Sequence, residues 1–146
     1  MNRSRFRSRG FTLFEMLAVV ALIAAAMVVL SIGIGRYQHR LAEDKALTAM
    51  VQALRAARVQ AIVSGQPATA QFGLIARSIK GPGQPTRQWP EGWQVQLNTA
   101  QGLGESYQFF PDGSASGGNL TITGRGRHWR IDINWLTGVV HLRKLP

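Results

Sequence analysis

Residues 9–15 of this chain read Arg9-Gly10-Phe11-Thr12-Leu13-Phe14-Glu15. An uncharged run of 20 residues follows at once, from Met16 to Gly35. At about 1.5 Å per residue, a helix of this length spans roughly 30 Å, the hydrocarbon thickness of a bilayer. A carboxylate next to lipid is unfavourable and generally has a partner. The sequence therefore predicts a functional role for Glu15, which stands at the start of the apolar run.

The charges around the apolar run are unevenly distributed. The first nine residues contain no acid, and their basic residues are Arg3, Arg5, Arg7 and Arg9. Only Arg36 and Arg40 follow the run closely. Because the positive charge is concentrated on the N-terminal side, we expect that side to stay in the cytoplasm. The rest of the chain would then face the periplasm or the outside, as part of a single-pass membrane protein.

Length and composition limit the class of protein. The 146 residues suit one small domain with an anchor, and the net charge is +10. Without the four leader arginines, the chain keeps 13 basic and 7 acidic residues, a net charge of +6. Such a balance allows contact with anionic lipid, nucleic acid or an acidic partner. The chain has no cysteine, which excludes disulfides, thiolate metal sites and thiol catalysis.

The pattern Gly-Phe-Thr-Leu-x-Glu at residues 10–15 resembles the processing site of type IV pilins and pseudopilins. The resemblance implies that prepilin peptidase removes a leader, residues 1–10, by cutting between Gly10 and Phe11, and that Phe11 is then N-methylated. It also implies that Glu15 meets the N-terminal amine of a neighbouring subunit during filament assembly. Electrostatics favours such a pairing, because two opposite charges in a low-dielectric helix bundle offset each other's free-energy cost of desolvation.

Two other interpretations of the N-terminal segment compete. One is a cleavable secretory signal, with small residues near 31–35. A signal peptide does not require a carboxylate at the position of Glu15, and no Ala-x-Ala cleavage site follows the apolar run. The other is an ordinary membrane anchor, which explains neither Glu15 nor the Gly10–Phe11 junction. The pilin-like interpretation accounts for the basic leader, the Gly10–Phe11 junction, Glu15 and the apolar run.

After Gly35 the pattern becomes amphipathic. Apolar residues recur at helical spacing, namely Leu47, Met50, Val51, Leu54, Ala57 and Ala61. The opposite face carries Gln52, Arg55, Arg58 and Gln60. Ser64-Gly65-Gln66-Pro67 provides a helix stop. We therefore expect one long helix, with a transmembrane or filament-core half at 11–35 and an amphipathic half at 36–64 that packs on a following sheet.

Within the remaining residues, 65–146, several short segments alternate apolar and polar residues, a pattern that indicates strands. The expected strands are 68–74, 93–98, 106–110, 120–123, 129–134 and 139–143. Residues 77–91 contain three prolines and two glycines, so we expect a loop there. One long helix followed by several short strands predicts an α+β fold, with the helix packed on an antiparallel, β-rich, pilin-like head.

Residues 110–118 form the most distinctive stretch of the head. Pro111-Asp112-Gly113 is typical of a turn between strands. A phosphate loop is excluded because no Gly-Lys-Ser/Thr follows. This turn and the later Ile-Asp-Ile-x-x-x-Thr-Gly-x-Val pattern at 131–140 resemble the minor pseudopilin H branch of type II secretion systems, although the turn is one residue short. The resemblance implies a minor subunit of the periplasmic pseudopilus, which assists export of folded proteins across the outer membrane.

A basic cluster at residues 124–130 supports an alternative. Its Gly-Arg-x-Arg letters resemble a DNA-binding motif of fimbrial T-like minor pilins of type IV pili, which take part in pilus assembly or DNA uptake. In that case Arg125, Arg127 and Arg130 contact nucleic acid, with Arg143 and Lys144 nearby. The simpler interpretation is a solvated hairpin turn with basic flanks.

No catalytic, metal or cofactor site emerges from the sequence. His39, His128 and His141 are scattered and lack ligand spacing. Turn and strand roles explain Asp112 and Asp132, and the four tryptophans suit core and rim packing. We therefore expect a structural protein, not an enzyme. Its implied partners are other pseudopilins, prepilin peptidase and the inner membrane.

Overall fold

The structure is a computed structural model that describes residues 12–146, and for residues 30–39 only the backbone is described. The chain divides into two compact units, Met1–Arg40 and Leu41–Pro146. We call the second of these the head unit. The one helix among the described residues, α1 (Leu13–Ser64, 52 residues), contributes to both units. The predicted cleavage site at Gly10 and Phe11, the leader arginines and the side chain of His39 lie outside the described residues.

Helix α1 begins and ends with local signals that the sequence carries. At its start, the Thr12 hydroxyl accepts a hydrogen bond from the Glu15 N–H at 3.2 Å, which satisfies one of the unpaired donors of the first turn. At its end, Gly65 adopts a φ of 66° and donates its N–H to the Ala61 carbonyl at 3.1 Å. The predicted stop at 64–67 is therefore confirmed.

The described surface of the first unit is mostly apolar. All side chains from residue 12 to residue 29 are exposed. Among the residues that the structure describes, no helical segment combines the length and the apolarity needed to cross a membrane. The expectation of a membrane-spanning or filament-core helix at 11–35 therefore stays a prediction.

The head unit contains two four-stranded sheets in which every neighbouring pair is antiparallel. The first has the order β3-β2-β1-β5. Its strands are β1 (Ala68–Gly73), β2 (Ser78–Lys80), β3 (Arg87–Gln88) and β5 (Ser106–Phe109). The second has the order β4-β6-β7-β8. Its strands are β4 (Gln94–Asn98), β6 (Gly118–Gly124), β7 (Arg127–Ile133) and β8 (Val140–Leu145). The α+β, antiparallel head is thus as predicted.

Two expectations about the strands need correction. Residues 77–91 are not a continuous loop, because they contain the short edge strands β2 and β3 between turns at their glycines and prolines. Strand β6 is longer than the expected 120–123, since it includes Gly118 and Gly124 at its ends. Glycine argues against a strand in sequence, but here it permits close approach. A Cβ on Gly118 would lie 2.2 Å from the Asn98 carbonyl oxygen.

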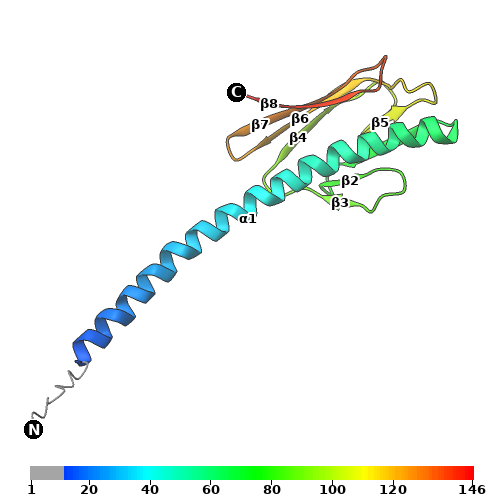
Figure 1. Cartoon of the computed structure of the whole chain (residues 1–146). Coiled ribbons are helices and arrows are strands. Elements are labelled where there is room, and N and C mark those ends of the chain that lie inside the picture. The colour runs from blue at the N-terminus through cyan, green and yellow to red at the C-terminus, as the bar shows by residue number, and fades with distance from the viewer. Residues whose placement is uncertain (1–11) are drawn as a thin grey trace, which may run out of the picture. The chain divides into compact units, whose positions relative to one another are not determined.

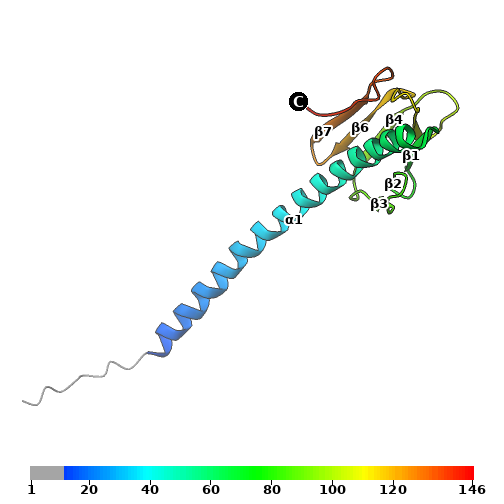
Figure 2. The same cartoon turned by 45° about the vertical axis from the view of Figure 1, so that its right-hand side comes forward.

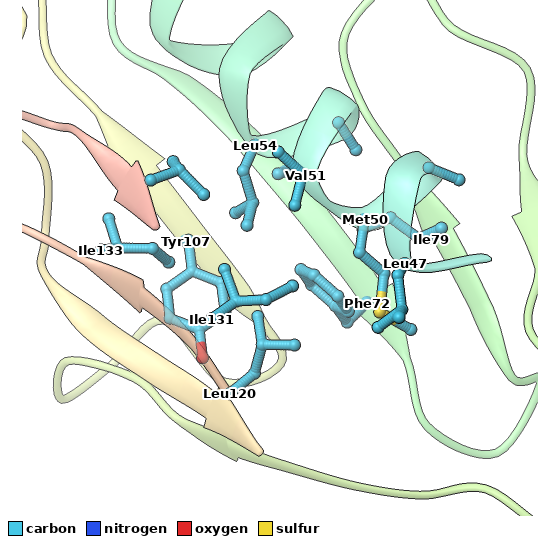
Figure 3. Packing of buried hydrophobic residues seen from close by; sticks show 14 of the residues in the cluster. Leu47, Met50, Val51, Leu54, Phe72, Ile79, Tyr107, Leu120, Ile131 and Ile133 are labelled. Carbon is cyan, nitrogen blue, oxygen red and sulfur yellow. The ribbon is translucent and has the colours of Figure 1, made fainter. Parts of the chain in front are cut away.

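One apolar cluster joins α1 to both sheets (Figure 3). The predicted helical stripe from Leu47 to Ala61 is buried throughout. In both views of the chain, β2 and β3 lie on the opposite side of α1 from β7 and β8 (Figures 1 and 2). Tyr107 of β5 is fully buried and donates its hydroxyl to the Asn119 carbonyl of β6 at 2.6 Å. Burial raises the pKa of Tyr107, and the hydrogen bond of its hydroxyl joins the two sheets.

Candidate functional site

Glu15, the predicted assembly residue, lies exposed in the first turn of α1. Thr12 and Glu15 have the Thr-x-x-Glu spacing of a capping box, of which the hydrogen bond from the Glu15 N–H to the Thr12 hydroxyl is one half. A carboxylate in this position also suits the positive end of the helix dipole. The structure therefore gives Glu15 a local role at the start of the helix, which exists whether or not a neighbouring amine is present.

The surface around Glu15 is almost entirely apolar. Leu13, Phe14 and Leu17 are 83%, 81% and 62% exposed, and apolar side chains continue in the same way to Val29. A helix that is apolar on all sides is stable only when lipid or other helices cover it. Within the described residues no other element covers residues 12–29. This part of α1 therefore needs an apolar environment that the chain itself does not provide.

A second arrangement lies in the head unit, where Arg58 of α1 meets two loops. Arg58 Nε donates to the carbonyls of Gly113 and Thr137, both at 3.1 Å. We call Arg58, Gly113, Thr137 and Gly138 the Arg58 junction. The helical pattern places Arg58 on the face opposite the apolar stripe, and its side chain is half-buried there. Its guanidinium joins the helix to both of the motifs that resemble the H branch.

Hydrogen bonds within each of the two loops fix the conformation of that loop. In the first, Asp112 Oδ1 accepts from the Ser114 hydroxyl at 2.6 Å and from the Ser114 N–H at 3.0 Å. These bonds hold the pKa of Asp112 below its ordinary value. In the second, Asn134 Oδ1 accepts two backbone N–H bonds at 3.0 Å, from Leu136 and Thr137. Both loops are therefore defined turns.

Gly138 allows the two loops to touch. Its φ is 63°, and a Cβ there would lie 2.2 Å from the Gly113 carbonyl oxygen and 2.8 Å from Arg58 Nε. Only glycine fits both the backbone conformation and the space. Sequence reasoning found the two motifs separately. The contact between them has no sequence signal, because 24 residues lie between Gly113 and Gly138.

Two of the three arginines in the basic cluster at 124–130 are paired with carboxylates. Arg127 forms an ion pair with Glu43 of α1, a residue that is only 2% exposed. The Arg127 guanidinium also lies 5.3 Å from the centre of the Trp129 ring. Arg127 is thus a structural contact between the helix and the β6–β7 hairpin.

Arg130 and Arg143 share a second carboxylate. Asp132 accepts from Arg130 at 2.7 Å and from Arg143 at 2.6 Å. Partial burial acts to raise the pKa of Asp132, but the hydrogen bonds and charges of the two arginines outweigh it and hold that pKa below its ordinary value. Of the three proposed nucleic-acid contacts, only Arg125 has no carboxylate partner among the described residues.

The other residues weighed as sites are dispersed. The ring Nδ1 of His128 lies 3.1 Å from the Thr123 hydroxyl on the neighbouring strand. Asp112 and Asp132 have separate partners and do not pair with each other. In the part of the chain that the structure describes, no group of three histidine or acidic side chains could hold a metal ion. Trp89, Trp93 and Trp129 are buried, whereas Trp135 is 66% exposed.

Comparison with known proteins agrees with this architecture. The sequence model of the type II transport protein GspH family matches residues 46–138, and that of the prokaryotic N-terminal methylation motif matches residues 5–31. The type II secretion system protein H of Xanthomonas campestris pv. campestris is 36% identical, over 93% of this chain and 83% of that protein.

Solved structures show the same fold. Two structures of the minor pseudopilin EpsH from the type 2 secretion system of Vibrio cholerae are similar, each at 17% identity. The TM-scores are 0.55 and 0.51, and the matches cover 70% and 69% of this chain and 96% and 92% of those chains. The predicted relationship to the pilin-like superfamily and its H branch is confirmed. The chain belongs to the family of the type II transport protein GspH.

Proposed function

We propose that this chain is a minor pseudopilin, a structural subunit of the periplasmic pseudopilus that assists export of folded proteins through a type II secretion system. The observation that carries the proposal is the combination of two features in one chain. A GspH-type head, matched at 46–138, follows an N-terminal methylation motif, matched at 5–31. The exposed apolar residues of α1 between 12 and 29 support it, since they need the cover that lipid or a helix bundle provides.

In this proposal the apolar part of α1 anchors the new chain in the inner membrane, with residues 1–10 in the cytoplasm and the head in the periplasm. Prepilin peptidase removes the leader after Gly10, and Phe11 becomes the methylated N-terminus. Glu15 then pairs with the N-terminal amine of a neighbouring pseudopilin as the helix passes from lipid into the filament core. The chain contributes contacts and catalyses no reaction.

The test is the intact mass of the protein purified from its native membranes. A chain that begins at Phe11 and is heavier by one methyl group is the expected result. A chain that begins beyond about residue 31 contradicts the proposal in favour of a secretory signal. An uncut chain that begins at Met1 contradicts the processing step.

The alternative role in a type IV pilus, with DNA bound at the basic cluster, is less well supported. Arg127 is engaged by Glu43, and Arg130 by Asp132, so these cations are partly neutralised before any phosphate approaches. Salt-sensitive binding of duplex DNA by the full-length chain, lost in the Arg125→Ala variant, would support this alternative. We expect the full-length chain to show no such binding of DNA.

A further inference from the structure

Exposed apolar side chains gather around the Arg58 junction. We call them the junction patch: Val59, Ile62 and Val63 of α1, and Trp135, Leu136 and Val139 of the β7–β8 turn. Their exposed fractions range from 38% to 77%. Large exposed apolar patches on soluble domains generally mark sites of interaction, and tryptophan is common at the energetic centre of interfaces. The patch has no role in the fold described above.

The two elements meet within the patch at one groove. Val59 and Val139 line one groove of about 230 Å³, together with Arg55 and Arg58. Ile62 lies next to the first loop, with its Cδ1 3.5 Å from where a Gly113 Cβ would be. Arg55, Val59 and Ile62 share one face of the helix, at spacings of four and three residues. An apolar groove with a cation at its edge is the result.

The two arginines at the groove have free hydrogen-bonding capacity. Arg55 is exposed and has no partner among the residues that the structure describes. Arg58 uses Nε for the two carbonyls, and within the described residues its two Nη atoms donate to no acceptor. Guanidinium groups beside an apolar groove suit a carboxylate on the bound partner. The groove therefore favours an acidic occupant that also carries an apolar side chain.

A second copy of this chain does not have that chemistry. Residues 41–146 carry 11 basic and 6 acidic side chains, a net charge of +5. Five of the six acids already have partners: Glu43 with Arg127, Glu91 with Arg77, Glu105 with the Leu74 N–H, Asp112 with Ser114, and Asp132 with Arg130 and Arg143. Of these six acids, only Asp44 is left without a partner in the described head unit. The occupant is thus a different and more acidic chain.

We propose that the junction patch docks a second, acidic subunit of the pseudopilus, which places an apolar side chain between Val59 and Val139 and a carboxylate against Arg55. This inference rests on the proposed function, because it takes the partner from the same filament. It adds the surface and the chemistry of the partner. The second H-branch motif then has a further role, since its Gly138, Val139 and Val140 form one wall of the groove.

The experiment is site-specific photo-cross-linking in cells that produce the complete secretion system. The full-length chain carries p-benzoylphenylalanine in place of Val59 or Leu136, and cross-linked chains are identified by mass spectrometry. The control position is Ile75, which is fully exposed in the β1–β2 turn and outside the patch. We expect a cross-link to another pilin-like subunit with an acidic head from both patch positions and none from Ile75. The added variant Arg55→Glu should reduce the yield about fivefold or more, whereas Lys80→Glu should not.

Each other outcome overturns the inference. Cross-links to a second copy of this chain contradict the acidic occupant, and yields equal to that from Ile75 contradict the surface. An equal melting temperature of the Arg55→Glu chain in detergent shows that a lost cross-link is not a folding defect. Co-fractionation of the unmodified chain with the other pseudopilins separates the two proposals. If the unmodified chain co-fractionates with the other pseudopilins but the patch gives no cross-link, only this inference fails. If the unmodified chain does not co-fractionate with them, the proposed function fails.

Discussion

Arg127 of β7 forms an ion pair with Glu43 of α1, although 84 residues separate them in sequence. Glu43 is the one charged side chain among the buried residues that the structure describes. A buried carboxylate without a partner is strongly unfavourable. The pairing therefore makes Arg127 a structural residue, and it explains why an arginine occurs at the start of a strand that is otherwise half apolar.

Replacing Arg127 by alanine should destabilise the head unit by about 3 kcal/mol or more, because the Glu43 charge is left buried and unpaired. Urea unfolding of the full-length chain in detergent measures this change. Trp93 and Trp129 are convenient reporters of fluorescence, since both are buried and their rings lie 5.4 Å apart near Arg127.

The matched control is Arg125→Ala, two residues away and exposed, which should change the free energy of unfolding by less than about 0.5 kcal/mol. The double variant Glu43→Leu/Arg127→Met should recover most of the loss, because no charge is then buried. A loss as large in the double variant as in Arg127→Ala would show that packing, and not the unpaired charge, accounts for the effect.

Gly138→Ala should be among the most damaging changes to the head unit. The substitution puts a Cβ 2.2 Å from the Gly113 carbonyl oxygen at a φ of 63°, and the two loops must move apart. We expect a loss of about 3 kcal/mol, read from the same urea unfolding curves. Gly126→Ala tests the cost of the backbone conformation alone, since the φ of Gly126 is 73° and no atom lies within 4 Å of the added Cβ. It should cost about 1 kcal/mol, and equal losses at both sites would contradict the close contact.

The Asp132 carboxylate should contribute stability that depends on pH. Its pKa in the folded chain is below the ordinary value of about 3.9, because Arg130 and Arg143 favour the charged form. The contribution is therefore present above pH ~4 and disappears as the pH falls through the folded-state pKa. Asp132→Asn should be less stable than the natural chain at pH 7 by at most about 1 kcal/mol, and the gap should close in acid. A gap that stays constant from pH 7 to pH 2 would rule out the carboxylate as its cause.

Glu15→Gln should separate the two roles of Glu15. Glutamine suits the capping-box position but carries no charge, so the start of α1 is retained while the pairing with an amine is lost. Incorporation into the filament, measured by co-purification with other pseudopilins, should fall about tenfold or more. Thr12→Ala removes the cap and keeps the charge, and it should incorporate normally. Normal incorporation of Glu15→Gln would mean that Glu15 serves only the helix.

Much of the fold could be predicted from sequence because it follows from local periodicity. The helical stripe from Leu47 to Ala61, the stop at Gly65 and the alternating strands depend on neighbours a few residues apart. The short strands β2 and β3 could not be predicted, since two or three residues give no period and their pairing depends on partners elsewhere in the sheet.

The head surface was harder to predict than the fold. Arg58 has the spacing of a solvent-facing residue, and only the folded chain brings Gly113 and Thr137 to its side chain. For the same reason the letters Gly124-Arg125-Gly126-Arg127 suggested a free basic motif. The carboxylates that engage Arg127 and Arg130 come from other positions, one of them 84 residues away.

The separation between Glu43 and Arg127 also has a consequence for the timing of folding. Synthesis delivers α1 first, and the strands that complete its cover, β6 to β8, come from the last 29 residues of the chain. Contacts so distant in sequence close late and slowly. The apolar stripe of α1 therefore gains its full cover only when translation is nearly finished.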